Sequence, residues 1–219
     1  MYSLNELDGL IRKSAVGAGL PVGYAEDLAT AGVWLARRGL PVCEIIASGL
    51  SEKAFPPICY VQTDSGYTFS GAQAVMAGPA AIDLLLVADQ SELEIELTGL
   101  DSPVLVLGFL GDAADRCREV FSLSLETEEM SGHAREYRLG PDAQIDPASF
   151  RPLGPCDAKV RRISKAGSYV LREGAIRYDP SDNLDTGWAR LETLAQRVYV
   201  PASSESRQRG AGAGLTDND

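Results

Sequence analysis

The sequence is short of the residues on which familiar active sites are built. It has one histidine, His133, and four cysteines, no two of which are close enough for a CxxC metal or redox motif. Reduced structural thiols are the preferred interpretation, and a catalytic Cys–His pair that uses His133 is the alternative. The cysteines are Cys43, Cys59, Cys117 and Cys156.

Long apolar runs and an export signal are also missing. The longest apolar stretches, Pro103 to Gly111 and Leu84 to Ala88, are bounded by aspartates and are shorter than the roughly 20 residues of a membrane-spanning helix. The first six residues contain no basic region followed by an apolar one, the pattern of a secretory signal. We therefore predict a cytoplasmic protein without membrane contact.

Positive charge is scarce, and the charges are unevenly placed. The net charge of −11 argues against nucleic acid as the main partner. Residues 54–115 hold nine Asp or Glu and no Lys or Arg, whereas residues 151–177 hold seven Lys or Arg and two acids. The simpler interpretation is that the basic segment lies across the acidic region of one fold. The alternative is a face that binds anions.

The composition is that of a globular protein. With 219 residues, of which 45% are hydrophobic and 23% charged, the chain is long enough for one sizeable domain. We predict a single α/β or α+β domain over residues 1–202, in which residues 1–53 form a helical module packed on a mixed β-sheet. A C-terminal helix and a Gly-rich tail, residues 203–219, complete the chain.

The helical module is predicted from periodicity and capping. Ser3 and Glu6 match a capping box, and Leu4, Leu7 and Ile11 follow at helical spacing. A second helix is expected over about 23–38 and a short third one around 45–50. A last helix is expected over about 185–199, and four of its residues should face the core: Trp188, Leu191, Ala195 and Val198.

The sheet is predicted from short apolar or alternating runs. A hairpin joins strands at 58–62 and 67–69, and Pro79 either kinks the following helix or begins a new one. Residues 93–97 alternate like a half-exposed strand, and residues 104–107 read as a central strand, followed by a helix that Asp112 caps. Further strands are expected over residues 120–125, 135–139, 160–163 and 169–171.

The C-terminal tail carries the pattern closest to a binding site. Alternating Gly and Ala leave backbone N–H groups open, and such a loop can form an anion-binding concavity. Arg207 and Arg209 precede it and offer charged donors, whereas Asp217 and Asp219 offer oxygen ligands for a hard cation. The predicted ligand- or partner-binding residues are Ser206, Arg207, Arg209, Gly210, Gly212, Gly214, Asp217 and Asp219.

Each candidate binding site also has an alternative interpretation. Gly-rich polar ends are often disordered, and no nucleotide motif is present in the tail, so we predict no cofactor and no metal site. Residues 108–111 occupy the place of a Rossmann phosphate loop, with the wrong glycine spacing. Arg161, Arg162, Lys165 and Tyr169 could contact an anion, but a solvated strand edge protected by charges is the preferred interpretation. Trp34 and Trp188 are expected in the core.

Two stretches resemble a bacterial family of uncharacterised proteins, the domain of unknown function 3726 (DUF3726) family. The first runs from Ser3-Leu4-Asn5-Glu6 to Gly39-Leu40-Pro41, and the second from Tyr199 to Asp219. The resemblance implies no reaction, because the family has no established activity. It does imply that the Gly-Ala ending is a family pattern rather than a random tail.

Two functions follow as hypotheses. In the first, the chain is a binding or accessory protein whose tail docks into a partner or a neighbouring protomer. The tail has both signs of charge, so its target must offer both signs as well. In the second, the chain is an enzyme that acts on a small anionic metabolite held by Arg207 and Arg209, with an acid such as Asp217 as base.

Overall fold

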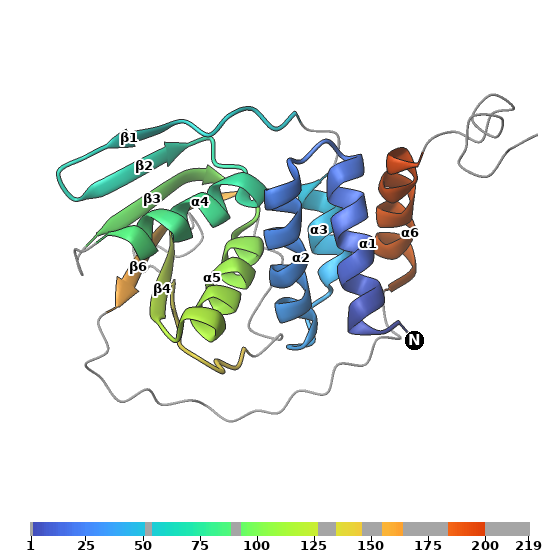
Figure 1. Ribbon diagram of the computed structural model, residues 1–219. Coiled ribbons are helices and arrows are strands. Elements are labelled where there is room, and N and C mark those ends of the chain that lie inside the picture. The colour runs from blue at the N-terminus through green and yellow to red at the C-terminus, as the bar shows by residue number, and fades with distance from the viewer. Residues whose placement is uncertain are drawn as a thin grey trace, which may run out of the picture.

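In the computed structural model the chain is an α+β protein. The described residues are 2–50, 54–88, 93–126, 135–145, 155–163 and 184–199. Helices of the N-terminal part pack with a mixed six-stranded sheet, and a helix ends the described chain (Figure 1). The predicted fold class is therefore confirmed. The boundary between a domain over 1–202 and a tail stays a prediction, because residues 200–219 lie outside the described residues.

The N-terminal helices form as their sequences predict. Helix α1 (Leu4–Gly17) begins with the expected capping box: Ser3 Oγ accepts from the Glu6 N–H at 3.2 Å, and the Ser3 N–H donates to Glu6 Oε2 at 2.7 Å. Leu7 and Ile11 are buried on its inner face. Helix α2 (Val22–Ala36) and helix α3 (Val42–Gly49) follow, so the predicted helical module is confirmed.

The sheet joins strands that are distant in sequence. Its order is β1-β2-β3-β6-β4-β5, and only β2 and β3 are parallel neighbours, connected by helix α4. Strand β6, the last of the six in sequence, lies between β3 and β4. The bounds are β1 Tyr60–Gln62, β2 Gly66–Ser70, β3 Glu94–Leu100, β4 Val120–Glu126, β5 Arg135–Leu139 and β6 Cys156–Ile163.

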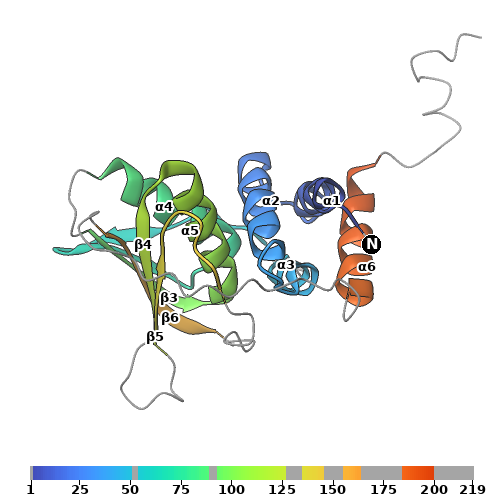
Figure 2. The same ribbon diagram turned by 90° about the horizontal axis from the view of Figure 1, so that it is seen from below.

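The layers are arranged in a row (Figures 1 and 2). Helices α4 (Ala74–Val87) and α5 (Pro103–Cys117) cover one face of the sheet, and α2 packs against α5. Helix α6 (Leu184–Ala195) lies against α1 and α3, so these helices separate it from the sheet. Of the helices in the described ranges, none has the length and apolar character needed to cross a membrane.

The predicted central strand at residues 104–107 is wrong. These residues belong to α5, which begins at Pro103, so Asp112 lies inside the helix and does not cap it. A proline at the first helical position loses no internal hydrogen bond, and its fixed φ favours a helix start. All residues from Pro103 to Gly111 are buried. Polar residues therefore do not recur among the apolar ones at helical spacing, and the sequence shows no helical period here.

At Pro79 the structure excludes one of the two alternatives, and at the last helix one expectation needs correction. Pro79 lies inside the continuous helix α4 and does not begin a second helix. Trp188, Leu191 and Ala195 are buried as expected, but Val198 is 44% exposed. The chain tightens into a 3-10 helix, η3 (Gln196–Val198), and the tighter turn rotates Val198 out of the α-helical register.

Helix α5 approaches α2 closely because two of its residues have no side chain. A Cβ built on Gly111 would overlap the indole ring of Trp34, and one on Gly108 would lie 2.8 Å from Leu35 Cδ1. Both aromatic and aliphatic side chains of α2 therefore sit directly on the α5 backbone. The spacing between the two helices depends on these glycines.

Gly111→Ala tests this spacing. The new methyl group would force Trp34 or the helix axis to move, and overpacking of this kind costs about 1–3 kcal/mol of the free energy of unfolding. Gly9→Ala in α1 is the matched control, because nothing lies within 4 Å of a Cβ at Gly9. We expect the control to stabilise the protein by up to about 1 kcal/mol in urea unfolding. Equal stability of the two variants would contradict the packing described.

Candidate functional site

The predicted binding residues all belong to the C-terminal tail, which lies outside the described residues. The structure therefore neither brings them together nor separates them: Ser206, Arg207, Arg209, Gly210, Gly212, Gly214, Asp217 and Asp219. What it does describe is the helix that leads into the tail and the surface on which that helix lies.

Helix α6 is held against α1 at the level of the backbone. A Cβ on Gly17 would overlap the carbonyl group of Leu194, so only glycine allows this approach. One turn earlier in α1, the buried Ser14 Oγ lies 2.7 Å from the carbonyl oxygen of Leu191 and hydrogen-bonds to it. The two helices thus meet backbone to backbone at Gly17 and through the short Ser14 side chain one turn earlier.

Further contacts hold α6 at its beginning and the chain just beyond its end. At the beginning of α6, a Cβ on Gly187 would lie 2.6 Å from the backbone nitrogen of Glu44 in α3. Beyond its end, Lys13 Nζ donates to Tyr199 Oη at 3.0 Å, although the Tyr199 side chain is 58% exposed. The point from which the chain continues to residue 200 is therefore set by α1 and α3.

The basic segment is used within the fold, as far as it is described. On β6, Arg161 Nε donates to Glu94 on β3 at 2.6 Å, and Lys159 Nζ lies 3.1 Å from Glu126 on β4. Arg162 donates to the carbonyl oxygens of Leu86 and Ala88 at the end of α4. This confirms for β6 that the basic segment lies across the acidic region.

The interpretation of Arg161 and Arg162 as a protected strand edge is wrong, because β6 is paired on both sides. Lys165 and Tyr169, the other members of that candidate, lie outside the described residues. The phosphate loop considered at residues 108–111 is also excluded. Those residues lie within α5 and pack on α2, so they form no loop between a strand and a helix.

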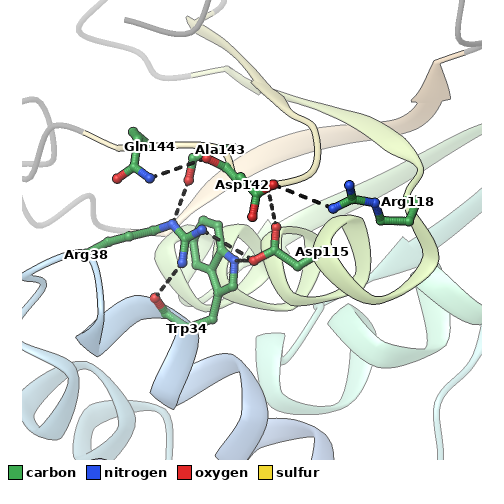
Figure 3. Close-up of polar contacts among 7 residues, drawn as sticks. All are labelled: Trp34, Arg38, Asp115, Arg118, Asp142, Ala143 and Gln144. Atoms are coloured by element: carbon green, nitrogen blue, oxygen red, sulfur yellow. Dashed lines mark hydrogen bonds and ion pairs between the residues drawn. The ribbon is translucent and has the colours of Figure 1, made fainter. Parts of the chain in front are cut away.

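The most extensive polar network joins α2, α5 and the segment 140–145 (Figure 3). At its centre is Arg38, whose side chain is only 8% exposed. Its Nε donates to the Ala143 carbonyl oxygen at 2.7 Å, its Nη1 to the Trp34 carbonyl oxygen at 3.1 Å, and its Nη2 to Asp115 Oδ2 at 3.4 Å. The guanidinium also lies 3.5 Å from the centre of the Trp34 ring. We call these residues, Trp34, Arg38 and Asp115, the Arg38 brace.

Asp115 completes the brace on the α5 side. Its Oδ2 also accepts from Trp34 Nε1 at 2.8 Å, and its Oδ1 accepts from the Asp142 N–H at 2.6 Å. Burial lowers the pKa of Arg38, and the nearby Asp115 carboxylate acts in the opposite direction. In the described part of the chain no buried side-chain nitrogen or oxygen lacks a partner. The side chains of the brace therefore hydrogen-bond to other residues of the chain, and they connect α2, α5 and the segment 140–145.

A small acidic cleft lies between α2, α4 and α5. Asp27, Asp83 and Asp112 line it together with Arg116, and its volume is about 30 Å³. That volume holds only about two water molecules. Burial raises the pKa of Asp27, the Asp83 carboxylate raises it further, and Arg116 opposes the rise. Within the described residues no group of three or more His, Cys, Asp or Glu is placed to hold a metal ion.

The cysteines are free thiols in the structure. Cys43 is buried, and burial raises the pKa of its thiol to about 11. It is therefore protonated at neutral pH and packs as a small apolar residue. His133 lies outside the described residues, so the alternative of a Cys–His pair stays a prediction.

Comparison with known proteins finds a family model that matches the first part of the chain. The family model described as protein of unknown function (DUF3726) matches residues 2–95, from α1 to the beginning of β3. The predicted resemblance to DUF3726 is confirmed for the first of its two stretches, whereas the second, Tyr199 to Asp219, lies outside the matched residues. Among curated proteins none matches the chain.

One solved structure is similar over most of its length. It is the crystal structure of a dehydrogenase from Sinorhizobium meliloti, with 12% sequence identity and a TM-score of 0.49. The match covers 90% of this chain and 93% of that one.

Sequence reasoning missed both the Arg38 brace and the acidic cleft. A partial signal exists for the first, since Trp34 and Arg38 are four residues apart at the end of an apolar helix, where an arginine can lie over an indole ring. Nothing in the sequence marks the Ala143 carbonyl oxygen as an acceptor. The cleft combines one acid from each of three helices, and only the packing of those helices brings them together.

Asp27→Asn tests the electrostatics of the cleft. Because the pKa of Asp27 is raised by folding, the folded protein holds the proton more tightly than the unfolded chain, and stability from this residue grows as pH falls. At pH 7 the wild type carries a half-buried charge that the amide lacks. We therefore expect a higher melting temperature for the variant at pH 7. The gain should shrink as the pH falls through the raised pKa of the folded state and be absent below about pH 4, the ordinary pKa of an aspartate.

The measurement is thermal unfolding from about pH 3 to about pH 8, with Asp64→Asn as the control. Asp64 is an exposed residue of the β1–β2 turn. A lower melting temperature of Asp27→Asn at pH 7, or a gain that does not change with pH, would contradict this description of the cleft.

Proposed function

We propose that the protein is a binding or accessory protein whose C-terminal tail, residues 203–219, docks into a partner subunit or a neighbouring protomer. The observation that carries the proposal is the fixed position of α6 on α1 and α3. A backbone contact at Gly17 and another at Gly187 hold the helix, and the chain continues from Tyr199 at its end.

A fixed starting point favours docking by a short segment. Ordering a free segment costs conformational entropy, on the order of 1–2 kcal/mol for each residue. Because α6 is already ordered, this cost applies only to residues beyond Tyr199. A fixed exit also places the start of the tail at a defined point of the surface, which raises its effective concentration at a partner bound nearby.

The charges of the tail set the chemistry of its partner. Arg207 and Arg209 precede the Gly-Ala run, and Asp217 and Asp219 follow it. The target should therefore present acids for one end of the tail and basic groups or backbone N–H groups for the other. The Gly-Ala run has no charge and lets two backbones come close.

Deleting residues 203–219 tests the proposal. Every described helix and strand remains in the shortened chain, so its melting temperature should stay within about 2 °C of the full chain. Its native mass, or the set of proteins that co-purify from the cells that make it, should change. If neither changes, the proposal is wrong.

Charge variants of the full chain make the test specific. The double variant Arg207→Ala and Arg209→Ala should weaken docking, and the effect should shrink as salt is raised, because screening already weakens the wild-type contact. Ser203→Ala with Ser204→Ala is the matched control, since these residues precede the charged part. Equal loss in both double variants would assign the contact to something other than charge.

The enzyme hypothesis gives a different result. A small anionic metabolite held by Arg207 and Arg209 would raise the melting temperature of the native protein without changing its mass. A thermal-shift series with inorganic phosphate, citrate and nucleoside monophosphates should then show a stabiliser whose effect is lost in Arg207→Ala. Such a result, together with an unchanged native mass after tail deletion, would replace docking by ligand binding.

A further inference from the structure

The two edges of the sheet differ in charge. The outer strand β5 (Arg135–Leu139) has three charged residues among its five, whereas β1 is Tyr60-Val61-Gln62 and has none. In the described residues no strand pairs with the outer side of β1 (Figure 1). Charged side chains commonly protect a free strand edge from further pairing, so β5 is protected in this way and β1 is not.

The side chains at the β1 edge are apolar and exposed. Val61 is 67% exposed and Tyr60 is 50% exposed. Tyr60 is already ordered by neighbouring rings, with its centroid 5.3 Å from those of Tyr67 and Phe69. A partner at this edge would therefore cover apolar surface without having to order a mobile aromatic side chain.

The sequence around β1 is almost without charge. Residues 54–82 contain a single charged residue, Asp64, in a chain with 51 charged side chains and a net charge of −11. Two copies of such an acidic chain repel each other over most of their surface. The strand β1 adds no charge of its own to this repulsion, which favours a second copy at this edge over a partner recognised by charge.

We propose that two copies of the chain pair along β1, antiparallel and about a twofold axis at Val61. Such a contact is self-complementary, with Val61 opposite Val61 of the partner subunit and Tyr60 beside Gln62 of the partner subunit. It extends the two six-stranded sheets into one sheet across both copies. The contact is separate from the C-terminal tail and does not rest on tail docking.

The sequence before β1 limits the length of the contact. Pro56 and Pro57 have no N–H to donate, so the added ladder ends at about Ile58. A ladder this short buries less surface than a permanent dimer needs. The expected dimer is reversible, with a dissociation constant of roughly 10–100 µM.

Val61→Lys tests the proposal by sedimentation equilibrium from about 5 to about 500 µM. In wild type the mass should rise with concentration from 23.3 kDa towards twice that value. In the variant two ammonium groups would face each other across the axis, and the dissociation constant should rise at least about tenfold. Val87→Lys is the matched control, because Val87 is an 82% exposed valine at the end of α4 and should leave dimerisation unchanged.

A cross-link gives an independent reading of the register. In a Cys59→Ser background, Val61→Cys should form a disulfide between copies under mild oxidation, since residues opposite each other in an antiparallel pair lie within disulfide distance. Val87→Cys in the same background should not. Thermal unfolding of each variant checks that the fold is intact, which is expected for exposed positions.

The outcomes separate this proposal from tail docking. Wild type that stays monomeric at 500 µM, or a dimer that survives Val61→Lys, overturns pairing through β1. A dimer that is lost on deletion of residues 203–219 and kept in Val61→Lys also overturns it, and assigns association to the tail. A dimer that survives the deletion and is lost in Val61→Lys supports the β1 contact, whatever happens to tail docking.

Discussion

The arrangement of the helical part on the sheet depends on the burial of one positive charge. Arg38 lies at the end of α2 with its guanidinium stacked on Trp34 and almost without solvent contact. A buried cation is stable only with a counter-ion and full hydrogen bonding, and Asp115 of α5 and the Ala143 carbonyl oxygen provide these. The same contacts fix the position of the segment 140–145. Gly111 allows the close approach of the helices that brings Trp34 onto α5.

Charge organises the sheet in a second way. The basic strand β6 comes late in the chain, yet it lies between β3 and β4, where Glu94 and Glu126 accept from it. These pairs are partly exposed, so each stabilises the fold only slightly, but together they favour one strand order over others. The two edge strands of the sheet, β1 and β5, also differ in charge. The charges of β5 protect one edge, and the uncharged β1 leaves the other open for pairing.

How far the sequence predicts this structure depends on how local the signal is. The capping box of Ser3 and Glu6 and the alternation in β3 are visible within a few residues, and both elements form as predicted. Residues 104–107 of α5 predict a strand because burial on all sides removes the helical period of the apolar residues. Two partners of Arg38, Asp115 and the Ala143 carbonyl oxygen, lie 77 and 105 residues further along the chain, so no local pattern could identify them. The predicted tail site lies outside the described residues and stays a prediction.

The most direct test of this account is a double-mutant cycle across the Arg38 brace. Arg38→Met, Asp115→Ala and the double variant are compared with wild type by urea unfolding. Removing Asp115 alone leaves the Arg38 charge buried without its counter-ion, so the double variant should be more stable than the sum of the single losses predicts, by about 1–3 kcal/mol. Losses that add to within about 0.5 kcal/mol would show that the pair does not join α2 to α5 energetically.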